Sequence, residues 1–179
     1  MSLDLPKQSQ LFVDECKAKE YYLAAAVTTS ASLTTVRNAL KAGRHKGTDY
    51  IHFVRERDAV KDRFIGIMRE CDLTAIMYVS ATKKHATARE ACLHAMLDDI
   101  AAQQIRQLTI ESDVSVDVAD RRIIAQRLKE LKYADLRYQH RGKKEEPLLW
   151  ASDAIAWCYN RGGIWRQKIE PLLIDVRSC

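Results

Sequence analysis

Three acidic residues stand in apolar surroundings and are the first candidates for chemistry. Asp14 follows the apolar run LFV, Glu111 follows LTI, and Asp153 is the only charged residue between positions 147 and 161. A carboxylate that loses its hydration without gaining a partner carries a large cost in free energy. Two strand-end carboxylates and one on a helix are the oxygen ligands that Mg²⁺ and Mn²⁺ take, usually with several waters. The pattern therefore favours a site for one or two such ions.

Alternatives remain open at each of these positions. Asp14 and Glu15 are adjacent, and adjacent side chains of a strand point to opposite faces, so we favour Asp14, on the side of Phe12. Each acid also has a structural interpretation: a strand end that meets solvent, or a helix-surface Asp that interacts with the helix dipole. The other acids that stay candidates are Asp113, which we include among the metal ligands, Asp117 and Asp120, with Glu90 or Asp98 as a fourth ligand.

His52 is the candidate for proton transfer. It lies between Ile51 and Phe53, which predicts a half-buried side chain, either a structural hydrogen-bonding group or a proton carrier at the rim of the site. A nucleophilic pair of Cys16 and His52 is a weaker alternative, because no third group at a recognisable spacing would orient the histidine. No glycine-rich phosphate loop and no dinucleotide-binding fingerprint is found.

Length, composition and charge limit the class of protein. The chain has 179 residues, 47% of them hydrophobic and 30% charged, which predicts one globular domain over residues 1–179. No apolar run approaches the roughly 20 residues of a membrane helix, and the first ten residues hold no apolar signal core, so we expect a cytoplasmic protein away from membranes. The five cysteines have no Cys-x-x-Cys spacing, which argues against a zinc site or a disulfide framework.

Basic residues gather in segments that are expected to be loops. The net charge of +5 is mild and permits a polyanionic partner without requiring one. Basic loops that converge above a strand-end site would hold a phosphate backbone in a salt-dependent way, and ordinary solvated surface is an equally good interpretation. The residues concerned are Lys41, Arg44, His45, Lys46, Arg55, Arg57, Lys83, Lys84, His85, Arg141, Lys143 and Lys144.

The hydrophobic pattern predicts a mixed five-stranded sheet flanked by helices. A hairpin at the start and alternating strand and helix units after it indicate an α/β architecture. The expected strands are 10–17, 20–29, 72–81, 106–112 and 134–140. The expected helices are 33–42, 58–71, 87–104, 117–132, 147–161 and 164–176.

Three short motifs resemble a bacterial family catalogued as a domain of unknown function. The segment 13–16, VDEC, resembles the Asp-Glu-Ser opening of that family, with Cys16 in place of its serine. The segments 51–53, IHF, and 148–157, LLWASDAIAW, resemble its later motifs, above all an apolar helix that contains Ala and Asp. The resemblance implies a ribonuclease H-like fold and a metal-dependent nuclease-type site formed by Asp14, Glu111 and Asp153.

We therefore expect a ribonuclease H-like nuclease that hydrolyses phosphodiester bonds of DNA or RNA with Mg²⁺ or Mn²⁺. Asp14, Glu111 and Asp153, with Asp113, would hold the ions, and His52 would assist. The alternative is a non-catalytic module of the same fold that binds nucleic acid or a protein partner. A third interpretation is a protein-interaction or toxin–antitoxin type component or a homo-oligomer, which an exposed apolar patch that includes Trp165 would favour.

Overall fold

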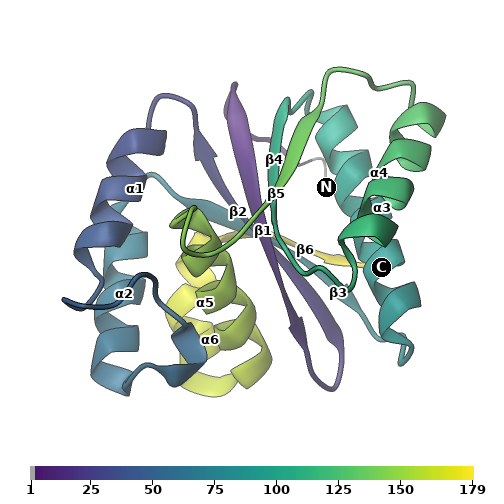
Figure 1. The fold of residues 1–179 in the computed structure, drawn as a ribbon. Helices are drawn as coiled ribbons and strands as arrows, with labels where there is room; N and C mark the ends of the chain where they lie inside the picture. The colour runs from purple at the N-terminus through teal and green to yellow at the C-terminus, as the bar shows by residue number, and fades with distance from the viewer. Residues whose placement is uncertain (1–2) are drawn as a thin grey trace.

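The computed structural model describes residues 3–179 and shows one mixed sheet between two layers of helices (Figure 1). The six strands lie in the order β5-β4-β1-β2-β3-β6. Their bounds are β1 Ser9–Lys17, β2 Tyr21–Thr29, β3 Thr74–Ser80, β4 Gln107–Glu111, β5 Arg137–Arg141 and β6 Leu173–Ser178. The helices are α1 Leu33–Ala42, α2 Asp58–Glu70, α3 His85–Ala102, α4 Asp117–Glu130, α5 Leu148–Arg161 and α6 Gly163–Ile169, with short 3₁₀ turns at Phe53–Arg55 and Glu170–Leu172.

The strand directions bring five strand ends to one edge of the sheet. β1 pairs with β2 and β2 with β3 in antiparallel fashion, whereas β1 with β4, β4 with β5 and β3 with β6 pair in parallel. The carboxyl ends of β1, β3, β4, β5 and β6 therefore share an edge. In open α/β sheets this is the edge at which ligands bind.

Two hydrophobic cores cover the two faces of the sheet. One core packs α1, α2, α5 and α6 against one face, around the fully buried Trp150, and the other packs α3 and α4 against the opposite face. In Figure 1 these two groups of helices lie to the left and right of the sheet. β1 and β2 are buried on both faces, which explains their nearly unbroken apolar sequences.

α5 is the helix that carries the most buried side chains for its length. Pro147 precedes its first turn, where a missing N–H is tolerated. Gly162 ends it with φ +71°, a left-handed conformation that favours glycine. Ser152, fully buried, donates a hydrogen bond to the carbonyl oxygen of Phe12 at 2.6 Å and so joins α5 to β1.

The predicted fold class is confirmed, and the sequence-based account of the C-terminus was wrong. We expected five strands and a last helix over 164–176, but α6 is short and is followed by a sixth strand, β6. Pro171 has no backbone N–H and cannot continue the helix. The residues after it alternate between half-buried and exposed, which is the period of a strand rather than of a helix.

No helix in the described part of the chain combines the length and the apolar character needed to cross a membrane.

Candidate metal-binding site

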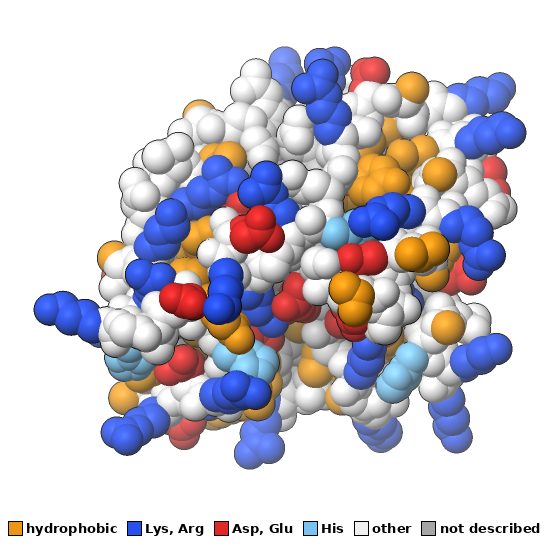
Figure 2. Space-filling view, in the orientation of Figure 1, with side chains coloured by type: hydrophobic (Ala, Val, Ile, Leu, Met, Phe, Trp, Pro, Cys, Tyr) orange, Lys and Arg blue, Asp and Glu red, His pale blue; other side chains and the backbone are white. Residues whose placement is uncertain are grey.

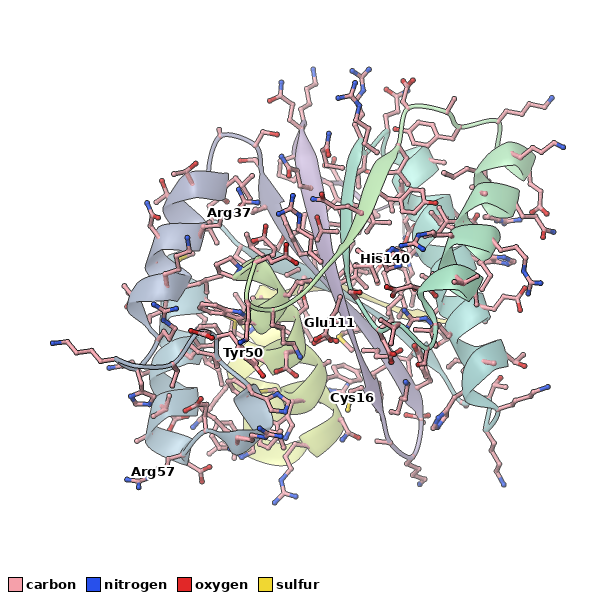
Figure 3. The ribbon with its side chains drawn as sticks, in the orientation of Figure 1. Cys16, Arg37, Tyr50, Arg57, Glu111 and His140 are labelled. Carbon is pink, nitrogen blue, oxygen red and sulfur yellow. The ribbon has the colours of Figure 1, made fainter. Side chains whose placement is uncertain are left out.

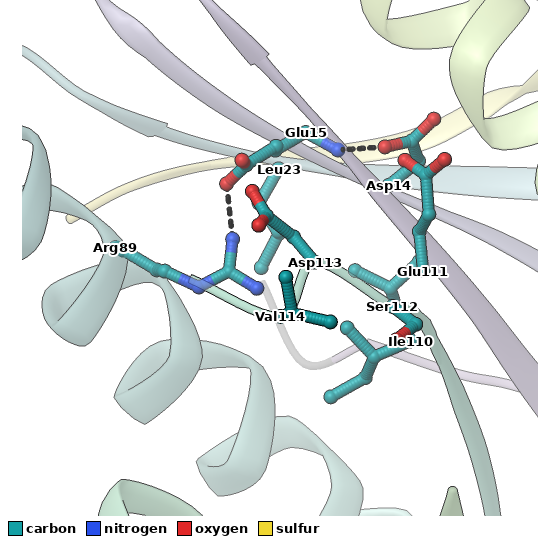
Figure 4. A pocket seen from close by; sticks show the side chains of 10 residues that line it. Asp14, Glu15, Leu23, Arg89, Ile110, Glu111, Ser112, Asp113 and Val114 are labelled. Carbon is teal, nitrogen blue, oxygen red and sulfur yellow. Dashed lines mark hydrogen bonds and ion pairs between the residues drawn. The ribbon is translucent and has the colours of Figure 1, made fainter. Parts of the chain in front are cut away.

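Asp14 and Glu111 lie side by side because of the register of two parallel strands. Val13 of β1 pairs with Ile110 of β4, so the next residues along the two strands, Asp14 and Glu111, are neighbours. Figure 4 shows their carboxylates next to each other, and Figure 3 places Glu111 near the middle of the molecule. Asp14 follows Phe12 on the face that α5 covers, as the strand periodicity predicted. Asp153 projects toward the same place from α5.

Lys143 lies at the centre of these three acids. Its ammonium Nζ is 2.9 Å from Asp14 Oδ2, 3.2 Å from Glu111 Oε1 and 3.4 Å from Asp153 Oδ2. The lysine belongs to the short segment between β5 and α5, and its side chain is 11% exposed. The structure thus brings together the three acids that the sequence singled out and shows them around one cation.

Asp14 is the most deeply buried of the three acids. Its side chain is 2% exposed. Burial, and next a hydrogen bond with Glu111, raise the pKa of Asp14 to about 8, although Lys143 acts in the opposite direction. Its Oδ2 contacts the lysine but makes no hydrogen bond of ordinary geometry. Asp14 is therefore a carboxyl group whose ionised form needs more positive charge than one ammonium supplies.

Asp153 is fixed from the other side by the 3₁₀ turn that follows His52. The backbone N–H of Phe53 donates to Asp153 Oδ2 at 3.1 Å. His52 Nδ1 lies 3.5 Å from the same oxygen and is, with Asp14 Oδ2, one of two buried side-chain atoms of residues 3–179 without a hydrogen bond. Both of these atoms face the acid cluster. His52 is half-buried, as expected from its apolar neighbours.

Cys16 lies on the same strand face as Asp14 but is poorly suited to act as a nucleophile. Burial, followed by the negative charges of Asp153 and Asp14, raises the pKa of the Cys16 thiol above its usual value. The reactive form of a cysteine is the thiolate, and this surrounding disfavours it. The geometry therefore gives no support to a Cys16–His52 pair.

A second cluster of ligand-type side chains lies on the other face of the sheet. Asp117 and Asp120 of α4 and His140 of β5 bring three ligand atoms within 4.8 Å of one another, closer than the three acids around Lys143. Arg89 of α3 already binds both oxygens of Asp120, at 2.7 Å each. Asp117 accepts hydrogen bonds from the hydroxyl of Ser112 and from a backbone N–H. This cluster is satisfied by groups of the protein itself.

Arg89 makes the central contacts of this second cluster. It also contacts Glu15 and donates to the hydroxyl of Tyr21 at 2.7 Å. Although burial acts in the opposite direction, hydrogen bonds from Arg89 and His140 lower the pKa of Asp120 below its usual value. Glu15 thus points away from Asp14 and toward α3, which agrees with the choice made between the two acids from strand periodicity (Figure 4).

The remaining acidic candidates have partners elsewhere. Asp113 accepts from the N–H and the hydroxyl of Ser115, at 2.9 and 2.6 Å, in the turn before α4. Asp98 forms a two-pronged ion pair with Arg127 between α3 and α4. Glu90 is exposed on α3. Asp117 and Asp120 belong to the satisfied cluster, so among these acids Asp113 alone also borders the cleft described next.

A cleft of about 400 Å³ opens beside Asp14 and Glu111 (Figure 4). It lies at the carboxyl ends of β1 and β4, and Arg89 and Asp113 line its other side. The space-filling view shows Lys and Arg side chains around the acidic groups near the middle of this face of the molecule (Figure 2). A polyanion that reached the acids would therefore meet positive charge on the way.

The contacts that Lys143, Arg89 and His140 make with the acids were not predicted from the sequence. Lys143 appeared as one of many basic loop residues, and nothing in its spacing from the acids shows that its ammonium reaches all three. Arg89 is one of several charged residues in a long helix, and nothing in the sequence shows that its side chain is buried. Only His140 had a signal in the sequence. It lies in an expected strand with an alternating pattern, and the helix before that strand begins with two acids, Asp117 and Asp120.

Of the comparisons with known proteins, one similarity to a solved structure bears on the fold. No protein-family model matches the chain, and no curated protein matches it. Among solved structures it is similar to a chain of the PCNA:RNase HII complex from Archaeoglobus fulgidus, with a TM-score of 0.56, 14% identity, and coverage of 90% of this chain and 76% of that one. It is also similar to a mutant of Bst-RNase HIII, with a TM-score of 0.45, 12% identity, and coverage of 94% and 65%.

The chain is thus an α/β protein with a ribonuclease H-like fold. At 14% identity the first of these similarities shows the fold and nothing about activity.

Proposed function

We propose that the protein is a metal-dependent nuclease that hydrolyses phosphodiester bonds of DNA or RNA. The observation that carries the proposal is the convergence of Asp14, Glu111 and Asp153, from two strands and a helix, on one cation at the ligand-binding edge of a ribonuclease H-like sheet. The donor set consists of oxygen atoms alone, which suits Mg²⁺ or Mn²⁺.

The acid cluster is a better metal site than the cluster around Arg89. In the acid cluster one ammonium faces three carboxylates, and Asp14 Oδ2 lacks a hydrogen bond. In the other cluster a guanidinium already occupies both oxygens of Asp120. Bound divalent ions supply activation of water and stabilisation of the leaving oxygen. We accordingly assign the metal to Asp14, Glu111 and Asp153, with Asp113 as a further ligand at the rim of the cleft.

The side chains around the acids have separate tasks. The N–H of Phe53 holds the carboxylate of Asp153 in place. His52, with a free Nδ1 beside Asp153, would exchange a proton with the attacking water or the leaving oxygen. The basic loops at the same edge of the sheet would hold the phosphate backbone, with an affinity that falls as salt rises.

The test is cleavage of labelled single-stranded and double-stranded DNA, RNA and RNA–DNA hybrid by the wild type and by Asp153→Asn. We expect cleavage that needs Mg²⁺ or Mn²⁺, and a loss of at least roughly a hundredfold in the variant, because a ligand of the ion is weakened. Asn keeps an oxygen to accept from Phe53, so the fold should survive, which thermal unfolding would check.

The matched control is Asp135→Asn, an exposed acid in the loop before β5. It should cleave as the wild type does. Unchanged turnover in Asp153→Asn, or full cleavage in the presence of a chelator, would contradict the proposal.

A second candidate function is favoured by one observation, the presence of Lys143 among the acids. A lysine that permanently neutralises the cluster would leave a non-catalytic module that binds nucleic acid or a protein through its basic loops. Both functions predict nucleic-acid binding that weakens with salt, but only the enzyme shows turnover that depends on metal. The cleavage assay therefore separates them.

A further inference from the structure

The side chain of Lys143 occupies the place in which the proposed function puts a metal ion. Its Nζ approaches one oxygen of each of Asp14, Glu111 and Asp153 within 2.9–3.4 Å. Mg²⁺ binds carboxylate oxygens at roughly 2.0–2.1 Å. An ion bound to these oxygens and the ammonium would thus compete for the same space and the same lone pairs.

The backbone near Lys143 is anchored independently of its ammonium. The carbonyl oxygen of Lys143 accepts a hydrogen bond from Trp150 Nε1 at 2.7 Å. Three residues further on, the buried Glu146 forms a two-pronged ion pair with Arg37 of α1. With the segment anchored in this way, the lysine side chain can move while the main chain stays in place. Its four-carbon stem has several rotatable bonds, so the ammonium can leave the acids without any change of the main chain.

We propose that Lys143 is a built-in competitor of the metal ion: its ammonium fills the acid cluster before metal binds and swings out when Mg²⁺ or Mn²⁺ enters. The proposal rests on the function proposed above and adds a device that regulates the same site. In the metal-free protein the ammonium compensates the negative charge of the acids around it. In exchange it lowers the affinity for metal, so that the site loads only above a threshold concentration of the ion.

The experiment is a calorimetric titration of Mn²⁺ into the wild type and into Lys143→Met, which keeps most of the length of the side chain and removes its charge. We expect Lys143→Met to bind Mn²⁺ more tightly by roughly tenfold or more, because no cation has to be expelled. Thermal unfolding gives a second measurement. With a chelator present Lys143→Met should melt at a lower temperature than the wild type, and Mn²⁺ should raise its melting temperature by more.

Lys144→Met is the matched control. It removes the same charge from the next residue of the same segment, where the ammonium pairs with Asp49 in the solvent and not with the acid cluster. Its affinity for Mn²⁺ should equal that of the wild type. An equal gain in both variants would show a general effect of net charge and overturn the proposal.

The other outcomes separate this inference from the proposed function. If Lys143→Met and the wild type bind Mn²⁺ equally, and Asp14→Asn abolishes binding, the metal site stands and the competitor is refuted. Weaker binding in Lys143→Met would also overturn the inference, because the lysine would then assist the metal. Binding in none of the proteins would overturn both. Tighter binding in Lys143→Met without cleavage of any nucleic acid would uphold the competitor and reject the nuclease.

Discussion

Burial of Asp14 lowers the stability of the metal-free protein as pH rises to about 8. Burial and the hydrogen bond with Glu111 raise the pKa of Asp14 to about 8, whereas an unfolded Asp titrates near 3.8. Between these two values the folded state binds more protons than the unfolded state, so the free energy of unfolding falls as pH rises. The contribution of this proton is complete below the unfolded pKa and is lost as pH passes through about 8.

We predict that Asp14→Asn removes this dependence. Urea unfolding from pH 5 to pH 9 with a chelator present should show a wild type whose midpoint falls toward pH 9, and a variant with a flatter profile. Since Asn is never charged, the variant should be the more stable protein at the alkaline end. Parallel profiles for the two proteins would contradict this account of Asp14.

At the residue scale, the sequence predicted the acids of the candidate site better than their partners. Asp14, Glu111 and Asp153 stand out because an acid in an apolar run is costly without a partner. The identity of the partner does not follow from the same pattern. Lys143 lies ten positions before Asp153 and far from the other two acids in sequence, and its flexible side chain reaches them only because β5 and α5 bracket the segment that carries it.

At the scale of elements, the contact between α5 and β1 fixes the distance between Asp153 and Asp14. The hydroxyl of Ser152 bonds the carbonyl of Phe12 at 2.6 Å, and Asp153 and Asp14 are close neighbours of these two residues in sequence. The contact is fully buried. Loss of one partner leaves a buried carbonyl without this donor, which is costly in a protein interior.

We predict that Ser152→Ala lowers the free energy of unfolding by about 1–2 kcal/mol and weakens Mn²⁺ binding as well. Ser178→Ala is the control, because Ser178 is exposed on β6, an edge strand separated from β1 by β2 and β3. It should change stability by less than about 0.5 kcal/mol. Urea unfolding and Mn²⁺ titration measure the two effects. A Ser152→Ala protein that is destabilised but binds Mn²⁺ as the wild type does would show that the contact supports the fold alone.

Helices and strands could be predicted from the sequence where their hydrophobic pattern was strong. β1, β2 and α5 are long apolar segments with clear ends, and each expected segment differs from the observed one by a single residue, at its start. The C-terminal segment failed because Ile169, Leu172 and Leu173 fit a helical spacing as well as a turn and a strand. Pairing with β3, a contact across about a hundred residues of sequence, decides in favour of the strand.

At the scale of the whole molecule, the topology concentrates positive charge at the edge that holds the acids. The segments after β3 and β5 carry Lys83, Lys84, Lys143 and Lys144, and both strands end at the same edge as β1 and β4. Sequence alone named these residues as basic loops but could not place them together, because their convergence depends on the order of the strands. The arrangement suits a polyanion that approaches the cleft beside Asp14.

The most direct measurement of the central claim is a crystal structure of the protein grown with Mn²⁺, with the ion located by anomalous scattering. Our account predicts a peak within coordination distance of the carboxylates of Asp14 and Asp153, with Glu111 nearby and the ammonium of Lys143 withdrawn. A peak at Asp117, Asp120 and His140, or crystals saturated with Mn²⁺ in which Lys143 still lies among the three acids and no ion is bound there, would contradict it.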